Sequence, residues 1–228
     1  MFKHWTLNGN VVSTQNPYTA IVTANSEYVA VFEIPTHNGY EYVDLGLSVK
    51  WATCNVGAES PEDYGDYFAW GETEAKEYYE RSSYKHCEGT STSLTKYCTS
   101  SNYGTADNKP WLELEDDAAH VNWGGNWRIP TDSELEDLMD YCTWEWTTQN
   151  GIYGYKATSK INGNFIFLPA AGSISAYDLR SDGWDSVYWS SHVTVHNESA
   201  YYLLLYPEVQ SISYGFRCYG RSVRAVWE

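Results

Sequence analysis

Alternating apolar and polar positions at the start of the chain predict short β-strands. Trp5 and Leu7 alternate with polar neighbours, and Asn8-Gly9 is a strong signal for a two-residue hairpin turn. Two further strand-like runs follow at 18–23 and 28–33. Because so few strands bury little surface, we expect residues 1–36 to be the end of a larger β-repeat, with a boundary in the segment 35–39.

From residue 42 onward the pattern predicts a second, larger domain over 40–228. An apolar face alternates with polar residues or glycine along 42–51, at Leu45, Leu47, Val49 and Trp51, which predicts one long strand. The region 60–107 is rich in Tyr, Gly, Ser and Thr and has little periodicity, which predicts loops and short helices. Strand-like runs return at 165–168, 187–191, 200–206 and 214–227.

One helix is well signalled between these regions. Thr131 and Glu134 fit a capping box, and apolar residues then recur on one helical face at Leu135, Leu138, Met139 and Cys142. Asp116 could begin or cap a second, short helix at 117–121. An early strand, a loop-rich middle with few helices and a group of late strands together predict an α+β fold.

The charge balance narrows the classes of partner. The net charge of −16 repels nucleic-acid phosphates and anionic lipid surfaces, so we expect no nucleic-acid partner. No apolar run approaches the length of a bilayer span and no leader sequence is evident, so we expect no direct membrane insertion. Aromatic residues make up 17% of the chain, mostly Tyr and Trp, types that suit exposed recognition surfaces as well as β-rich cores.

The five cysteines form no Cys-x-x-Cys pair, which argues against a structural zinc site. Their odd number leaves at least one thiol free. Cys87 and Cys98 flank a Gly/Ser/Thr loop and could form a local disulfide in an oxidising compartment.

Several sequence blocks, taken in order, resemble a known family. They lie at 42–58, 64–72, 116–119, 123–131, 167–172, 188–191 and 220–224. Together they resemble the Fibrobacter succinogenes major paralogous domain, which is common in surface proteins of gut Bacteroidetes. The resemblance implies a C-type-lectin-like fold related to the formylglycine-generating enzymes, and a location outside the cell or on its surface. Residues 1–34 resemble the end of a bacterial Ig-like or InlB-type repeat.

The cysteines of this chain differ from those that the related enzymes use for catalysis. Gly215-Phe216-Arg217-Cys218 is similar to the tail motif of formylglycine-generating enzymes, whose oxidation chemistry uses a pair of reactive cysteines upstream of that tail. No cysteine lies between Cys142 and Cys218. We therefore expect the protein not to be an enzyme of this type.

Calcium is the one cofactor that the sequence leaves open. The calcium-binding signatures of classical C-type lectins are absent. Acidic residues that could supply oxygen ligands occur without the spacing of an EF-hand loop, at Asp63, Asp66, Glu115, Asp116 and Asp117. Solvated acidic loops are the favoured interpretation.

The stretch 181–219 has the composition most typical of a binding site. In the fold that the resemblance implies, this region forms the ligand face, and variable proteins of diversity-generating retroelements diversify such residues just before a Gly-Phe-Arg-like motif. The candidate ligand-binding residues are Trp184, Tyr188, His192, His196, Asn197, Tyr201, Tyr202, Tyr206, Tyr214 and Tyr219. Alternate residues of a strand point inward, which predicts that about half of these side chains are buried.

Other candidate residues favour structural roles. His192 and His196 would lie about 13 Å apart on a strand, too far for one metal ion. We expect Trp123 and Trp127 to fill the core, and Arg128, Arg221 and Arg224 to form ion pairs or bind backbone groups.

The sequence thus predicts a non-enzymatic ligand-binding module of a bacterial surface or phage-borne protein, recognising protein or glycan on a cell surface through an aromatic face. A structural spacer domain is the alternative, and a formylglycine-generating-enzyme-like or carbohydrate-active enzyme is less favoured.

Overall fold

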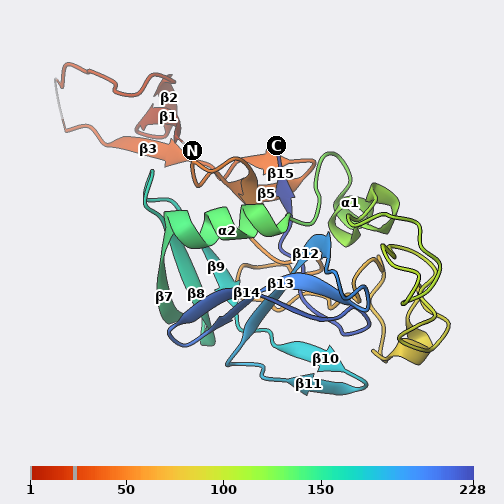
Figure 1. Cartoon of the computed structure of the whole chain (residues 1–228). Coiled ribbons are helices and arrows are strands. Elements are labelled where there is room, and N and C mark those ends of the chain that lie inside the picture. Colours follow the sequence, from red (N-terminus) through yellow and green to blue (C-terminus); the bar gives the residue numbers. More distant parts are fainter. Residues whose placement is uncertain (1, 23–24) are drawn as a thin grey trace.

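The computed structural model describes residues 2–22 and 25–228, and within them the protein is mostly β. Strands account for 39% and helices for 10%, and the strands form several small antiparallel sheets (Figure 1). The predicted α+β class is therefore wrong, and the arrangement does not show the C-type-lectin-like fold. The class differs because α2 (Asp132–Tyr141) is the one described helix longer than six residues, and the other helical segments are short turns in the loops between strands.

The N-terminal sheet stands at one end of the molecule, apart from the other sheets (Figure 1). It consists of β1 (Phe2–Leu7), β2 (Asn10–Ser13) and β3 (Tyr28–Phe32) in the order β2-β1-β3. The predicted hairpin at Asn8-Gly9 is confirmed, because both residues have the positive φ angles, 48° and 83°, that such a turn requires. The strand predicted at 18–23 is not formed over 18–22, and Thr23 lies outside the described residues.

The next sheet joins early and late segments of the chain. Its order is β15-β6-β5-β4, from β4 (Thr36–His37), β5 (Tyr40–Val43), β6 (Lys50–Ala52) and β15 (Val226–Trp227). The long strand predicted over 42–51 is wrong, because Asp44 accepts a hydrogen bond from Gly46 N at 2.8 Å and Gly46 turns the chain with a φ of 76°. Since β4 begins inside the segment 35–39, the division into 1–36 and 40–228 stays a prediction.

The helix α2 (Asp132–Tyr141) confirms its capping box, with Thr131 and Glu134 each binding the other's backbone N–H. It buries Leu135 and Leu138 and leads directly into a three-stranded sheet. That sheet has the order β7-β8-β9, from β7 (Cys142–Gln149), β8 (Ile152–Ser159) and β9 (Phe165–Pro169). The β7–β8 hairpin was not predicted, although Asn150-Gly151 carries the same turn signal as Asn8-Gly9.

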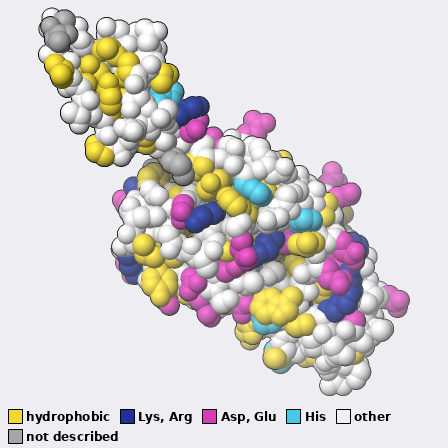
Figure 2. Space-filling view, turned by 90° about the horizontal axis from the view of Figure 1, so that it is seen from above, with side chains coloured by type: hydrophobic (Ala, Val, Ile, Leu, Met, Phe, Trp, Pro, Cys, Tyr) yellow, Lys and Arg dark blue, Asp and Glu magenta, His cyan; other side chains and the backbone are white. Residues whose placement is uncertain are grey.

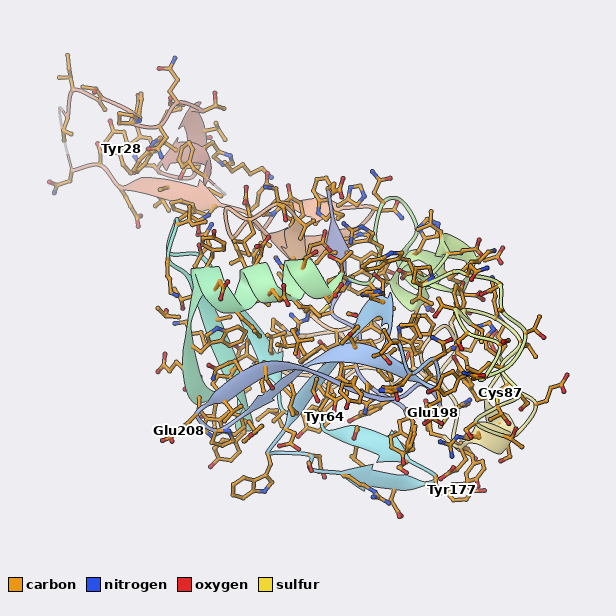
Figure 3. All side chains as sticks on the ribbon, viewed as in Figure 1. Tyr28, Tyr64, Cys87, Tyr177, Glu198 and Glu208 are labelled. Carbon is orange, nitrogen blue, oxygen red and sulfur yellow. The ribbon has the colours of Figure 1, made fainter. Side chains whose placement is uncertain are left out.

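The late strands form a sheet in the order β12-β13-β14, from β12 (Ser186–Val193), β13 (Ser199–Tyr206) and β14 (Val209–Phe216). Helix α2 packs against this sheet. A two-stranded hairpin of β10 (Ser173–Ser175) and β11 (Asp178–Arg180) projects beside it, with Tyr177 at its tip (Figure 3). The strand predicted over 214–227 is split, because β14 ends at Phe216 and β15 begins only at Val226.

The middle of the chain is loop-rich, as predicted, with two 3-10 turns, η1 (Arg81–Ser83) and η2 (Leu114–Asp116), and the short helix α1 (Ala118–Trp123). The cap of α1 is Asp117, which accepts hydrogen bonds from Ala119 N and His120 N. The prediction that Asp116 caps this helix is therefore wrong. Asp116 instead binds the ammonium groups of Lys85 and Lys96, each at 2.7 Å.

Buried arginines fasten these loops to the sheets. Arg224 donates to the carbonyl oxygens of Ala52, Thr53 and Phe167, between 2.7 and 3.1 Å, and Arg221 lies between the rings of Trp189 and Tyr202. Arg128 pairs with Glu134 at 2.6 Å. The structural interpretation of Arg128 and Arg224 is confirmed, and Trp123 and Trp127 are core residues as predicted.

All five cysteines are free. Cys98 is buried and directs its sulfur toward the amide oxygen of Asn197. The local disulfide considered between Cys87 and Cys98 is therefore absent from this structure.

Candidate functional site

Six aromatic side chains follow one another across one end of the late sheet, and we call them the aromatic strip. In spatial order they are Trp111, His192, Tyr201, Tyr214, His196 and Tyr103. Each contacts the next, or lies opposite it across a strand pair. Trp111, Tyr214 and His196 are exposed, and the other three are half-buried.

The strip lies on the face of the sheet that α2 covers, just beyond the N-terminal end of that helix. Tyr201 shares this face with Leu203 and Leu205, which pack in the core with Leu135 and Leu138 of α2. Tyr214 lies directly opposite Tyr201 across the β13–β14 ladder, where side chains are close neighbours. The helix does not extend beyond its first residue, Asp132, so the part of this sheet face that lies past Asp132 is left uncovered and forms the strip.

The first half of the strip is held by stacking and an ion-pair geometry. The rings of Trp111 and His192 stack, with centroids 3.8 Å apart and planes 16° apart. His192 Nδ1 lies 3.1 Å from the carboxylate of Asp132 at the start of α2, which fixes the orientation of the imidazole. Tyr201 follows at 5.3 Å from His192. The flat faces are thus pre-positioned, so a ligand would order few side chains on binding.

The second half of the strip closes over the turn between β12 and β13. The rings of His196 and Tyr214 lie 6.5 Å apart, and His196 Nδ1 is 3.1 Å from the hydroxyl of Tyr103. The turn itself is fixed by Asn197, which is fully buried and binds both Thr99 and Thr194. The exposed rings therefore rest on a rigid support.

The structure brings together four of the ten predicted residues: His192, His196, Tyr201 and Tyr214. Two others, Tyr188 and Asn197, are buried, at 1% and 0% exposure. The half-buried Tyr202 packs on Arg221, and Tyr219 on Phe216. Trp184 and Tyr206 are exposed but lie at the other end of the sheet: Tyr206 is the last residue of β13, roughly 17 Å along the strand from Tyr201, and Trp184 precedes β12, whose first residue Ser186 pairs with Leu205.

Two members of the strip were missed by sequence reasoning. Trp111 and Tyr103 lie in the loop-rich middle, and Trp111 reaches β12 because Leu112 N and Val193 N bind across to Ser191 O and Pro110 O. Pro110 marked a loop, but no local pattern indicates this long-range pairing.

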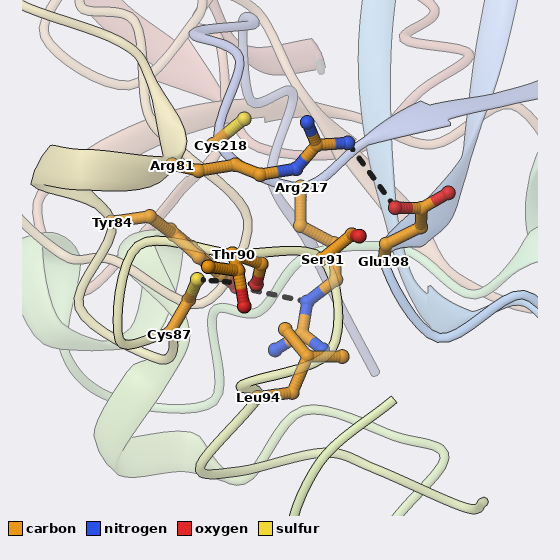
Figure 4. A pocket seen from close by; sticks show the side chains of 9 residues that line it. All are labelled: Arg81, Tyr84, Cys87, Thr90, Ser91, Leu94, Glu198, Arg217 and Cys218. Carbon is orange, nitrogen blue, oxygen red and sulfur yellow. Dashed lines mark hydrogen bonds and ion pairs between the residues drawn. The ribbon is translucent and has the colours of Figure 1, made fainter. Parts of the chain in front are cut away.

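A small cavity near η1 lacks the size of a ligand site (Figure 4). It encloses about 10 Å³ among nine residues that include Arg81, Cys87, Glu198 and Arg217, enough for about one water molecule. Arg217 crosses it to bind Tyr84 Oη at 2.9 Å, and Arg81 pairs with Glu198 at 3.1 Å. The polar groups that line this cavity therefore bind one another and stabilise the surrounding loops.

Three of the five acidic residues considered for calcium have other contacts. Asp116 is paired with lysines, Glu115 pairs with Lys96 at 2.7 Å, and Asp117 caps α1. Among the described residues, no group of three or more His, Cys, Asp or Glu side chains could hold a metal ion. On the face seen from above, acidic side chains are spread over the body, with basic ones between them (Figure 2).

The buried thiols are poor nucleophiles. Burial raises the pKa of Cys142 and of Cys218 to about 11, so at neutral pH both sulfur atoms remain protonated. Cys218 thus has the chemistry of a core residue, in keeping with its place in the packed cluster around Tyr79 and Tyr84.

Comparisons of the chain with protein-family models, with curated proteins and with solved structures found no match. Within residues 2–22 and 25–228, neither helix has the length and apolar character needed to cross a membrane.

Proposed function

We propose that this protein is a non-enzymatic binding module that recognises a protein or glycan ligand through the aromatic strip. The observation that carries the proposal is the row of six rings, in which Tyr201 and Tyr214 are paired across the β13–β14 ladder, and which Asp132 and Asn197 hold in place. Tyr, Trp and His combine rigid apolar area with hydrogen-bonding tips, which is the composition of recognition surfaces. The sequence blocks that resemble surface proteins of gut Bacteroidetes support a ligand on a cell surface and a location outside the cell.

The strip favours binding over a spacer role. A spacer has no need for exposed aromatic area. In the aromatic strip, however, Trp111 exposes 42% of its surface and Tyr214 exposes 58%. The strip also differs from the remaining exposed aromatics, since Tyr177 and Trp184 stand on separate elements.

The experiment is a binding panel of glycans and gut bacterial surface proteins, run in calcium and again in chelator. We expect Tyr214→Ser to weaken binding to any hit by about tenfold or more, because central aromatic contacts dominate interface energies. The matched control is Tyr177→Ser, which removes a tyrosine that is 74% exposed and lies outside the strip. Equal binding by the two variants would show that the strip is not the ligand face.

A further inference from the structure

A second concave surface lies at the other side of the protein, between β5 and β9. This groove has a volume of about 690 Å³, within the range of about 300–1,000 Å³ typical of ligand sites. Its lining is mainly apolar and includes Ile34, Pro35, Tyr42, Val43, Phe165 and Phe167. It shares no residue with the aromatic strip.

Two sets of contacts span the ends of the groove and fix its width. At one end, Asn164 Nδ2 donates to Asp44 O at 2.8 Å. At the other, Arg224 donates to Phe167 O at 2.9 Å and to Thr53 O at 2.7 Å. Between these bridges, the outer edge of β9 faces β5 without a strand beside it, because β9 pairs only with β8.

Phe165 presents both of its backbone polar groups to this gap. In the β8–β9 ladder, hydrogen-bonded and non-hydrogen-bonded pairs alternate. Ser159 N donates to Asn164 O and Ala170 N to Tyr153 O, both at 2.8 Å, which makes Phe165 a non-hydrogen-bonded position of that ladder. Its N–H and C=O therefore point away from β8, and within residues 2–22 and 25–228 neither forms a hydrogen bond.

Three acidic residues lie next to residues that line the groove. Glu41 precedes the lining residue Tyr42 and accepts a hydrogen bond at its backbone oxygen from the lining residue Thr53 at 3.1 Å, and Asp63 follows two positions after the lining residue Pro61. Glu62 lies beside the lining residue Pro61 and holds the amide groups of Gln149 and Asn150. Among the described residues, none of these three carboxylates forms an ion pair with a basic group. Two ammonium groups also contact lining residues: Lys50 pairs with Asp44 at 2.8 Å, and Lys156 lies 4.3 Å from the centroid of the Phe165 ring. The three carboxylates are paired with neither, so they remain open to a cation from a ligand.

We propose that this groove binds a short, extended peptide in which basic residues flank a large apolar one. Phe165 N–H and C=O pair with one peptide residue as in an antiparallel ladder, an apolar side chain enters the groove, and Lys or Arg side chains meet Glu41, Glu62 and Asp63. The paired backbone groups favour a peptide over a glycan, and the three carboxylates favour a basic peptide. This site is independent of the aromatic strip.

The first test uses the full chain labelled with ¹⁵N-phenylalanine, which gives six amide signals. The probe is the acetylated and amidated heptapeptide Lys-Thr-Val-Phe-Val-Thr-Arg. We expect the Phe165 amide signal to shift and its hydrogen exchange to slow by about tenfold or more, while Phe2 and Phe32 stay unchanged. The same peptide with Glu in place of Lys and Arg should bind about tenfold more weakly. Failure of the Phe165 signal to respond at a saturating peptide concentration would overturn the proposal.

The second test removes the outward N–H, and a paired variant controls for the loss of the aromatic ring. Phe165→Pro is suited to the first residue of an edge strand, where the ladder does not use that N–H. We expect it to weaken the peptide by about tenfold, whereas Phe165→Leu, which keeps the N–H, should bind within about threefold of the natural chain.

A charge variant keeps the test decisive if the proline variant does not fold. The double substitution Glu41→Gln with Asp63→Asn changes two exposed residues and should both weaken the peptide and flatten its salt dependence. Unchanged affinity in this double variant, or a Phe165 shift caused by maltohexaose and not by the peptide, would contradict the proposal. Neither set of variants touches the aromatic strip, so binding there should be unaffected.

Discussion

At the scale of single residues, the loop-rich body is organised by buried guanidinium groups. Arg217 is 1% exposed and donates to the backbone oxygens of Lys96, Tyr97 and Asn197 while its guanidinium lies 4.7 Å above the ring of Trp70. A planar group with five donors in a fixed arrangement can satisfy several loop carbonyls at once, whereas an ammonium group has only three donors. The motif that resembles an enzyme tail thus performs a structural task in this protein.

Two adjacent carboxylates at the same scale have opposite protonation behaviour. Burial raises the pKa of Asp117 to about 6, although its oxygens accept three backbone N–H groups, which favour the charged form. Burial alone would also raise the pKa of Asp116, but hydrogen bonds from Lys85 and Lys96 lower it to about 2. Of these two carboxylates, only Asp117 therefore changes its charge between pH 4 and pH 7 in the folded state.

This difference predicts the sign of a pH effect on stability. The folded state holds the Asp117 proton more tightly than the unfolded chain, so its stabilising contribution is complete below pH 3.8 and is lost as the pH rises through about 6. A difference of about two pKa units corresponds to about 2–3 kcal/mol. Asp117→Asn abolishes this titration and also loses the hydrogen bond to Ile129 N at all pH values.

Urea unfolding of the natural chain and of Asp117→Asn at several pH values measures this effect. We expect the stability advantage of the natural chain to be larger at pH 4.5 than at pH 7.5. Asp178→Asn, an exposed control, should show no such trend. A pH-independent gap between the natural chain and Asp117→Asn would be inconsistent with a titrating buried carboxyl.

At the scale of elements, sequence patterns correctly predicted a cap and a turn that depend only on neighbouring residues. The capping box of α2 and the turn at Asn8-Gly9 depend on residues next to one another, so the sequence located both. The broken strand at Asp44 escaped prediction because its alternating apolar residues, Leu45 and Val49 among them, are buried by a turn rather than by a strand. The hairpin at Asn150-Gly151 escaped because its first strand is rich in polar residues.

Gly151 tests whether that turn carries the hairpin. Its φ is 87°, and a Cβ there would meet nothing within 4 Å, so the cost of a side chain is purely conformational. We expect Gly151→Ala to lower the free energy of unfolding by about 1–2 kcal/mol, and Gly151→Asn to lower it by less, because Asn tolerates positive φ. Thermal or urea unfolding measures both. Equal losses in the two variants would contradict a conformational cause.

At the scale of the whole molecule, the aromatic strip is assembled from segments that are distant in the sequence. The composition of 181–219 predicted four of its members, because tyrosines and histidines on late strands are visible in the sequence. It could not predict which strand face is exposed, since that depends on where α2 begins. Nor could it predict that backbone pairing of a loop would place Trp111 against His192. The assignment of Trp184 to the same face rested on sequence proximity alone.

Trp111 and Trp184 provide the most direct measurement of the central claim. Both tryptophans are exposed, at 42% and 67%, but only Trp111 belongs to the strip. The full chain labelled with 5-fluorotryptophan would be titrated with the strongest binder from the panel, with Trp111→Phe and Trp184→Phe used to assign the two ¹⁹F signals. The account predicts a shift of the Trp111 signal with the Trp184 signal unchanged. A shift of Trp184 alone would place the ligand on another surface and contradict the strip as the binding site.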